Sequence, residues 1–241
     1  MIERATGSRR VGRGICGCLL NCELDEFSGY LNHPNIDMVE WRIDEFLLRH
    51  PRERMPLFNG KISASPRHAL MATNRPVREL GSFEGPEDLR LKTIEEAAVA
   101  GAEWVDIEHD VALQFVPRFH EAGARVLVSW HSPAETPSGR DLRARLEKMC
   151  KTGADAIKIA TLARTDEDNL RVLELIPLAR KEFNIDLIAF CMGSAGKWSR
   201  IAALFLGSPW TYARMPGQPP AAPGQLSAEE IGTVVDLMER A

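Results

Sequence analysis

The sequence predicts an α/β fold, a single-domain (β/α)8 (TIM) barrel, and three observations support this prediction. The chain has 241 residues, close to the roughly 250 residues that are typical of such barrels. Eight short segments are apolar or alternate between apolar and polar residues. Amphipathic or turn-rich segments of helical length separate most of them. Strand and helix patterns that alternate in this way predict a parallel sheet covered by helices.

The predicted strands are short and rich in β-branched, aromatic and small residues. They lie at 14–20, 37–43, 68–74, 103–109, 125–131, 155–161, 186–192 and 211–215. Apolar residues recur at helical spacing in four clear segments, at 86–101, 138–153, 166–183 and 227–240. The first of these ends in Gly101, a common helix stop, and either Ser138 or Asp141 would cap the second. The proline- and glycine-rich segment 215–225 follows the eighth strand, where a loop would overhang the mouth of a barrel.

No proline- or serine-rich linker divides the chain. We therefore expect a flexible N-terminal arm at 1–13, followed by one catalytic domain at 14–241. The arm contains basic residues, but no long apolar segment with a cleavage site follows them, so we expect no secretory signal.

Charge and cysteine content narrow the classes of function. The chain has 30 basic and 34 acidic residues, for a net charge of −4, without a long run of one sign. This composition does not favour binding to nucleic acid or to an anionic membrane, and no stretch of about 18 apolar residues predicts a membrane span. Cys16, Cys18 and Cys22 cluster, but no second cysteine or histidine pair stands at zinc spacing, so we expect no metal there. With Cys150 and Cys191 the cysteines are odd in number, and reduced thiols in the cytoplasm are the simpler inference.

Polar residues occur near the carboxyl ends of the predicted strands, where catalytic side chains of barrels lie. Each pair is two residues apart and therefore shares one face of its strand. The pairs are Glu40 and Arg42, Thr73 and Arg75, Asp106 and Glu108, and Ser129 and His131. Such pairs also occur as ordinary ion pairs, and a lone histidine is more often structural than catalytic. Together with Lys158, however, they predict a carbonyl-processing site that also holds a carboxylate.

Lys158 lies in the middle of an apolar run, between Ile157 and Ile159. One interpretation is a solvated lysine, whose stem packs along apolar surface while its ammonium reaches water. The other is a buried amine, because burial favours the neutral form that attacks a carbonyl carbon. Ala156 and Ala160 share its face and leave space for a ligand, whereas both isoleucines point the other way.

Six blocks in the chain carry a resemblance to a known family. They are VEWRID, TNRPVRELG, SWHSPAETPS, GADAIKIA, FCMGSAGKWSR and PAAPGQLSAEEI, and they occur in this order between residue 39 and residue 231. In order and spacing they resemble the motifs of type I 3-dehydroquinate dehydratase. The resemblance implies a cofactor-free barrel that dehydrates 3-dehydroquinate to 3-dehydroshikimate in the shikimate pathway to aromatic amino acids. Family members are commonly dimeric, which implies a homodimer by analogy alone.

The resemblance also implies roles for individual residues. Lys158 would form a Schiff base with the substrate ketone, His131 would be the general acid–base, and Glu79 would orient His131. The remaining residues would bind or enclose the substrate: Glu40 and Arg42 at its hydroxyl and carboxylate groups, Arg75, Arg200 at the carboxylate, Met192 and Tyr212 in the apolar wall, and Gln225 on the lid.

Two positions depart from the family pattern. Leu80 stands where the family often has glycine after the glutamate, and Ala221 stands where the lid often carries a substrate-binding serine. Loss of one hydrogen bond costs about 0.5–1.5 kcal/mol, so Ala221 would weaken substrate binding about three- to tenfold without abolishing the chemistry. Two alternatives stay open from the sequence: a class I aldolase-type barrel with a strand-borne lysine, and a catalytically silent barrel that binds a protein partner.

Overall fold

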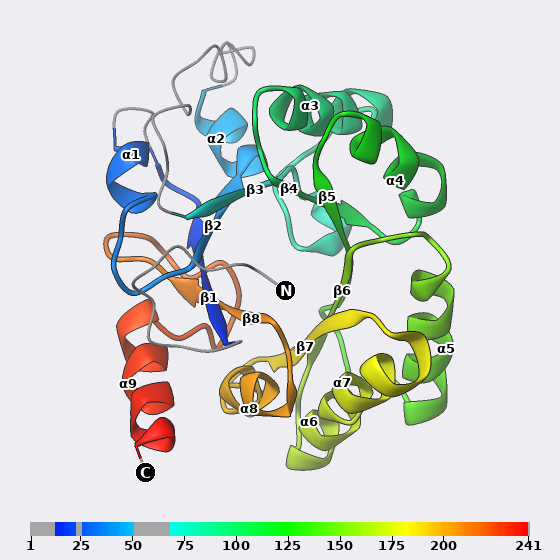
Figure 1. Ribbon diagram of the computed structural model, residues 1–241, viewed down its shortest axis with the longest axis vertical. Helices are drawn as coiled ribbons and strands as arrows, with labels where there is room; N and C mark the ends of the chain where they lie inside the picture. Colours follow the sequence, from blue (N-terminus) through cyan, green and yellow to red (C-terminus); the bar gives the residue numbers. More distant parts are fainter. Residues whose placement is uncertain (1–12, 23–25, 51–67, 241) are drawn as a thin grey trace.

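All eight predicted strands are present in the computed structural model, which describes residues 13–22, 26–50 and 68–240 (Figure 1). The strands are β1 (Gly14–Leu19), β2 (Met38–Arg42), β3 (Ala69–Thr73), β4 (Trp104–Glu108), β5 (Arg125–Ser132), β6 (Ala156–Leu162), β7 (Asp186–Met192) and β8 (Trp210–Arg214). Of the predicted arm at 1–13, only Arg13 is among the described residues, and its guanidinium contacts Glu239 and the ring of Phe205.

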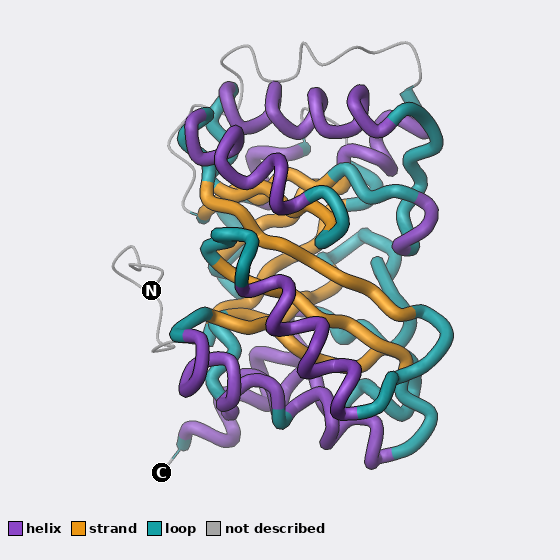
Figure 2. Tube along the Cα trace, turned by 90° about the vertical axis from the view of Figure 1, so that its right-hand side faces the viewer, coloured by secondary structure: helices purple, strands orange, loops and turns teal. Residues whose placement is uncertain are grey.

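The strands form one parallel sheet that curves into a nearly closed barrel. Their order is β7-β6-β5-β4-β3-β2-β1-β8, so the first strand pairs with both the second and the last. The tilted strands run inside a layer of helices, which Figure 2 shows from the side. This confirms the predicted (β/α)8 fold and brings the carboxyl ends of all eight strands to one rim.

The helices confirm most of the predicted pattern. They are α1 (Phe27–Tyr30), α2 (Ile43–Arg49), α3 (Glu87–Val99), α4 (Ala112–Glu121), α5 (Gly139–Cys150), α6 (Asp166–Leu173), α7 (Leu175–Leu178), α8 (Ser199–Leu206) and α9 (Ala228–Glu239), together with the 3-10 turn η1 (Val77–Glu79) and the π-helical turn η2 (Ala179–Phe183).

The prediction of one helix over 166–183 was wrong in detail, because that segment is divided into α6, α7 and η2. Pro177 explains the break: it has no N–H to donate to the carbonyl of Leu173, the residue at which α6 ends.

Side chains at the helix ends account for several of the boundaries. Ser138 precedes α5 and its hydroxyl accepts from the backbone N–H of Asp141 at 3.2 Å, so of the two predicted caps Ser138 is the N-cap. Ser227 and Glu230 form a reciprocal capping box at the start of α9. After α3 the chain turns at Gly101 with φ of +111°, a conformation that favours glycine.

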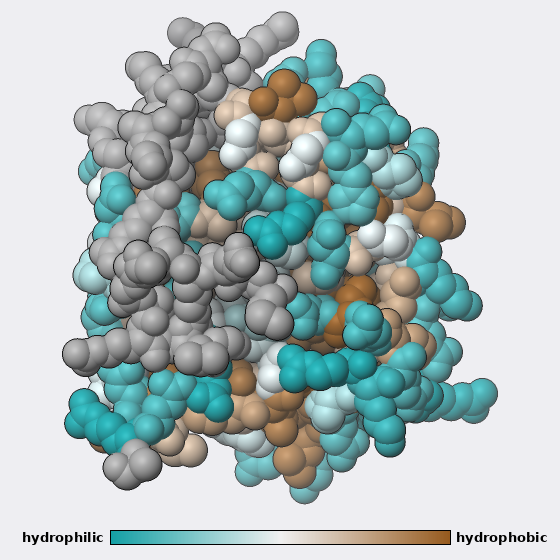
Figure 3. Space-filling model, in the orientation of Figure 1, coloured by the Kyte–Doolittle hydropathy of each residue, from teal (hydrophilic) through white to brown (hydrophobic). Residues whose placement is uncertain are grey.

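The alternation along each strand separates two apolar layers. Ile157 and Ile159 of β6 pack outward against the helices, whereas Ala156 and Ala160 face the barrel interior with the ring of Tyr212. This confirms the two faces that the sequence predicted for β6. The face of the molecule shown in Figure 3 is largely hydrophilic with scattered apolar residues. Within the described ranges, no helix has the length and apolar character needed to cross a membrane.

Candidate active site

A cavity opens at the carboxyl ends of the strands, and it encloses about 460 Å³ of space, part of it open to solvent. Its wall contains all ten residues that the sequence singled out: Glu40, Arg42, Arg75, Glu79, His131, Lys158, Met192, Arg200, Tyr212 and Gln225. Six further residues complete the lining: Cys18, Leu80, Ala160, Phe190, Ala221 and Ala222. The predicted rim of polar residues is therefore one site.

Lys158 projects from the middle of β6 into this cavity, and its side chain is only 7% exposed. This burial favours the buried amine over the solvated lysine that the sequence left open. The Nζ atom lies 3.8 Å from the Oδ2 atom of Asp106 and 3.9 Å from the centre of the Tyr212 ring. Both neighbours are placed to stabilise the positive charge of an iminium formed on this nitrogen.

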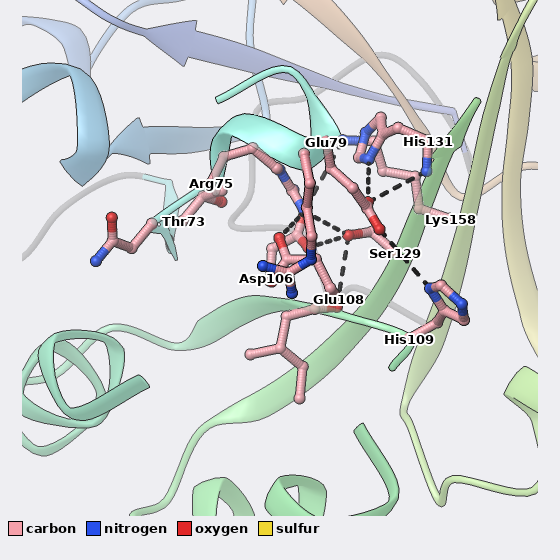
Figure 4. Close-up of polar contacts among 12 residues, drawn as sticks. Thr73, Arg75, Glu79, Asp106, Glu108, His109, Ser129, His131 and Lys158 are labelled. Carbon is pink, nitrogen blue, oxygen red and sulfur yellow. Dashed lines mark hydrogen bonds and ion pairs between the residues drawn. The ribbon is translucent and has the colours of Figure 1, made fainter. Parts of the chain in front are cut away.

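His131 and Glu79 form a hydrogen-bonded pair beside the lysine (Figure 4). The Nδ1 atom of His131 lies 2.9 Å from the Oε2 atom of Glu79, and an ionised carboxylate can only accept, so the imidazole proton is on Nδ1. Burial, together with the positive charges of Arg75 and Lys158, lowers the pKa of His131 from 6.5 to about 4. The ring is therefore neutral near pH 7, and its Nε2 lone pair is able to accept a proton.

A tight turn holds Glu79 in place. Glu79 ends η1, and Leu80 follows in the left-handed region with φ of +66°. A Cβ atom on Gly81 would lie 1.9 Å from the carbonyl oxygen of Arg75, so only glycine fits there. The glycine that the family often has in place of Leu80 would satisfy the positive φ without strain. Leu80 adopts the same conformation with its side chain 44% exposed at the pocket mouth.

Arg75 lines the cavity, but its guanidinium is also the centre of a buried ionic network (Figure 4). It donates to Glu108 at 2.6 Å and to the hydroxyl of Ser129 at 2.7 Å, and it also donates to Asp106. Burial opposes the positive charge, yet these carboxylates raise the pKa of Arg75 well above its ordinary value. The predicted contact with substrate stays a prediction, and the network is an additional role that the sequence did not indicate.

Arg42 and Glu40 are held by neighbours rather than by each other. Arg42 makes a bidentate pair with Asp44 through Nε at 2.8 Å and Nη2 at 2.6 Å. Glu40 accepts from the hydroxyl of Thr73 at 3.0 Å and from the thiol of Cys18 at 3.2 Å. Both side chains are buried, which excludes the exposed ion pair that the sequence alone allowed.

Arg200, at the start of α8, is 1% exposed, and no ion pair to it is found within the described part of the chain. Its guanidinium lies 4.3 Å from the centre of the Phe190 ring and donates weakly to the carbonyl of Pro223 at 3.5 Å. Burial lowers the pKa of Arg200 from 12.5 to about 10. A buried cation that no carboxylate neutralises is suited to bind an anionic group of a ligand.

Ala221, Ala222 and Gln225 of the segment 215–225 line the cavity, as expected for a loop at its mouth. The side chain of Gln225 accepts from the backbone N–H of Ala221 at 2.6 Å and donates to the sulfur of Cys18 at 3.3 Å. The backbone N–H of Gly193 donates to Pro223 at 3.0 Å, which joins this lid to the loop after β7. The methyl group of Ala221 faces the cavity where a serine hydroxyl would lie.

The structure brings three further titratable side chains into contact with site residues. The sequence did not point to Asp44 or His109, and it indicated Asp106 only as a strand-end carboxylate. His109 follows β4 directly, with its Nδ1 atom 3.7 Å from the Oε1 atom of Glu79. Among the described residues, no three histidine, cysteine or acidic side chains cluster in a way that could hold a metal ion. No disulfide bond joins the described cysteines.

Fold and site together define the class: a (β/α)8-barrel enzyme whose cavity combines a buried lysine, a histidine–glutamate pair and an unneutralised arginine. The family model for type I 3-dehydroquinase matches residues 18–241. The chain belongs to this family.

Named relatives agree with this assignment. The chain is 44% identical over 224 residues to a 3-dehydroquinate dehydratase of Syntrophobacter fumaroxidans, covering 93% of this chain and 96% of the relative. The type I 3-dehydroquinate dehydratase structure from Clostridium difficile superposes with a TM-score of 0.81 at 25% identity, covering 93% of this chain and 91% of that one. The enzyme from Geobacillus kaustophilus gives a TM-score of 0.80 at 26% identity, with coverage of 94% and 92%.

Proposed function

We propose that the chain dehydrates 3-dehydroquinate to 3-dehydroshikimate through a Schiff base on Lys158. The observation that carries this proposal is the shared cavity in which a buried lysine amine, a neutral histidine and an unneutralised arginine line the same space. The three groups correspond to the three parts of the substrate that matter: a ketone, an acidic C–H group and a carboxylate.

Lys158 supplies the electron sink. Its neutral amine attacks carbon 3 of the substrate, and loss of the ketone oxygen as water leaves a protonated imine. Asp106, whose Oδ2 atom lies 3.8 Å from Nζ, is placed to stabilise the positive charge of this iminium. The positive nitrogen withdraws electrons from carbon 2, so its C–H bond becomes acidic enough for a histidine to act as the base.

His131 then moves the protons. Its Nε2 atom removes a proton from carbon 2, and the electron pair forms an enamine. The enamine expels the hydroxyl group of carbon 1, which takes the proton back from the imidazolium and leaves as water. Glu79 holds the ring through Nδ1 at 2.9 Å and stabilises the transient imidazolium. Hydrolysis of the imine releases the product and restores Lys158.

The remaining predicted residues would hold the ring in position. Arg200 would bind the substrate carboxylate, because it is buried and forms no ion pair with a described acidic side chain. Glu40 and Arg42, on β2, would bind hydroxyl and carboxylate groups of the substrate, and Gln225 would close over the substrate from the lid. Arg75 would contact substrate from the cavity wall, while its Nη1 and Nη2 groups hold the carboxylates of β4.

Reduction with borohydride tests the covalent step. With 3-dehydroquinate or the product present, reduction should trap one adduct, and peptide mass mapping should place it on Lys158. Lys158→Met should abolish both the adduct and the rise in ultraviolet absorbance from the conjugated enone. Lys151→Met, at an exposed lysine beyond α5, is the matched control and should retain both. An adduct on another lysine, or none, would reject the assignment of Lys158.

The alternatives from the sequence predict other results. An aldolase-type barrel would cleave or form a carbon–carbon bond and would leave the enone absorbance flat with 3-dehydroquinate. A silent barrel would bind a protein partner without turnover. Family membership and the intact set of Lys158, His131 and Glu79 favour the dehydratase. We further propose that it acts on this small molecule in the cytoplasm, as a homodimer of 14–241 barrels and without a cofactor. The cysteines without disulfide bonds favour the cytoplasm.

A further inference from the structure

Glu79 lies between two histidines, of which the proposed mechanism uses only one. Its Oε2 atom contacts His131 at 2.9 Å, and its Oε1 atom lies 3.7 Å from the Nδ1 atom of His109. His109 reaches the carboxylate from the end of β4, on the side away from His131 (Figure 4). Its side chain is 23% exposed, so this histidine closes the network toward the surface.

Arg145 determines which nitrogen of His109 carries the proton. The Nη1 atom of Arg145 lies 2.5 Å from the Nε2 atom of His109. A guanidinium can only donate, so Nε2 accepts and the proton of the neutral ring is on Nδ1. The Nδ1 atom makes no hydrogen bond to any described residue, and the Oε1 atom of Glu79 lies 3.7 Å from it. The tautomer of His109 therefore places an N–H group beside the carboxylate of Glu79.

The ring of Trp130 contacts both Arg145 and His109. The guanidinium of Arg145 stacks 4.4 Å from the centre of the Trp130 ring, and the ring of His109 meets the same indole edge-to-face at 6.4 Å. Trp130 precedes His131 in β5, so the indole lies on the helix side of the strand and the imidazole on the cavity side. β5 therefore carries both Trp130, which contacts His109 and Arg145, and His131, which Glu79 orients.

We propose that His109 is a positioning residue for the acid–base step, in that its Nδ1–H group, directed by Arg145, holds one oxygen of Glu79 so that the other oxygen faces His131. The inference rests on the proposed function for its effect on turnover. It assigns the second oxygen of Glu79 a partner outside the substrate cavity, so that substrate binding does not compete for it.

Several charges set the protonation of His131, and His109 changes only one of their contributions. Arg75 before η1 and Lys158 on β6 disfavour the imidazolium, whereas Glu79 on η1 and Asp106 on β4 favour it. The Nδ1–H group of His109 draws part of the Glu79 charge away from His131. Without the Nδ1–H group of His109, the full negative charge of Glu79 would act on His131. The imidazolium of His131 should therefore form at a higher pH.

His109→Leu removes the donor with little change of volume, and His109→Asn keeps an N–H donor near the position of Nδ1. We expect His109→Leu to lower kcat about tenfold, equivalent to one hydrogen bond to a charged group, with KM within about twofold of wild type. The acid limb of the pH profile of kcat should move up by about half a unit. His109→Asn should restore both to within about twofold and a few tenths of a unit. His120→Leu is the control, because it removes an exposed histidine–carboxylate contact, with Asp155, far from the cavity.

Nitrogen NMR of the histidine rings reads the same geometry without turnover. In wild type, His131 should be the Nδ1–H tautomer, and His109→Leu should give a mixture and raise its titration midpoint. If His109→Leu matches the His120→Leu control in both kinetics and titration, or if His109→Asn is as impaired as His109→Leu, the inference is wrong. A wild-type chain that does not dehydrate 3-dehydroquinate would refute the proposed function instead, and the NMR result would still decide the inference.

Discussion

Replacement of Arg200 by methionine should stabilise the fold and abolish most of the activity. Burial lowers the pKa of Arg200 from 12.5 to about 10. At about 1.36 kcal/mol per pKa unit, the buried charge therefore costs about 3 kcal/mol of folding free energy at pH 7. Methionine has a similar length and no charge. It forfeits the contact with the Phe190 ring, 4.3 Å away, which is worth about 1–2 kcal/mol when desolvated.

The net expectation for Arg200→Met is a gain of about 1–2 kcal/mol, or about 2–8 °C in Tm for a domain of this size. Calorimetry measures the change, with Arg200→Lys as the control that keeps a buried charge and should show no gain. The same variant loses a buried partner for the substrate carboxylate, which costs about 2–5 kcal/mol. The ultraviolet assay should therefore show kcat/KM reduced by about 10²-fold or more. A destabilised Arg200→Met with unchanged kcat/KM would refute this reasoning about the cation.

Three further predictions follow from the geometry. Leu80→Gly should change stability by less than about 1 kcal/mol, because relief of the left-handed φ offsets the added chain entropy, whereas β-branched Leu80→Ile should lose about 1–2 kcal/mol more; equal urea midpoints for the two would contradict this. Asp44→Asn should lose about 3–5 kcal/mol, because it leaves the buried charge of Arg42 unpaired; urea unfolding measures the loss, and a change below about 1 kcal/mol would refute it. Because the pKa of His131 is lowered to about 4 in the folded chain, the unfolded chain binds its proton first, and stability should fall by up to about 3 kcal/mol between pH 6.5 and pH 4. His131→Asn should remove this part of the pH dependence, and an unchanged slope in urea unfolding would show that another group causes it.

The placement of site residues followed from strand periodicity. In β6, the alternation that directs Ile157 and Ile159 outward also directs Lys158 inward, and the parallel register brings its neighbours to the same rim. The resemblance of motifs then added residues outside the strands, such as Arg200 at the start of α8 and Gln225 on the lid, which strand periodicity does not predict. All of them line one cavity.

The ionic contacts behind the rim did not follow from the sequence. Arg75 pairs with Asp106 and Glu108 because the barrel register places β3 beside β4, and no local pattern states which carboxylate an arginine will meet. His109 approaches Glu79 across 30 residues of chain. A histidine at the last position of the predicted strand 103–109 was the available signal, and one residue of that kind is too common to carry a prediction.

The carbonyl of Pro223 accepts from two groups, the backbone N–H of Gly193 and the guanidinium of Arg200. Arg200, which we propose to bind the substrate carboxylate, therefore also forms a hydrogen bond with the lid at the cavity mouth. A small anion bound at Arg200 would hold both contacts with Pro223 in place. The lid would then be cleaved more slowly by a protease. Cleavage of 215–225 under limited digestion should thus report occupancy of the anion subsite, even by molecules too inert to form an imine.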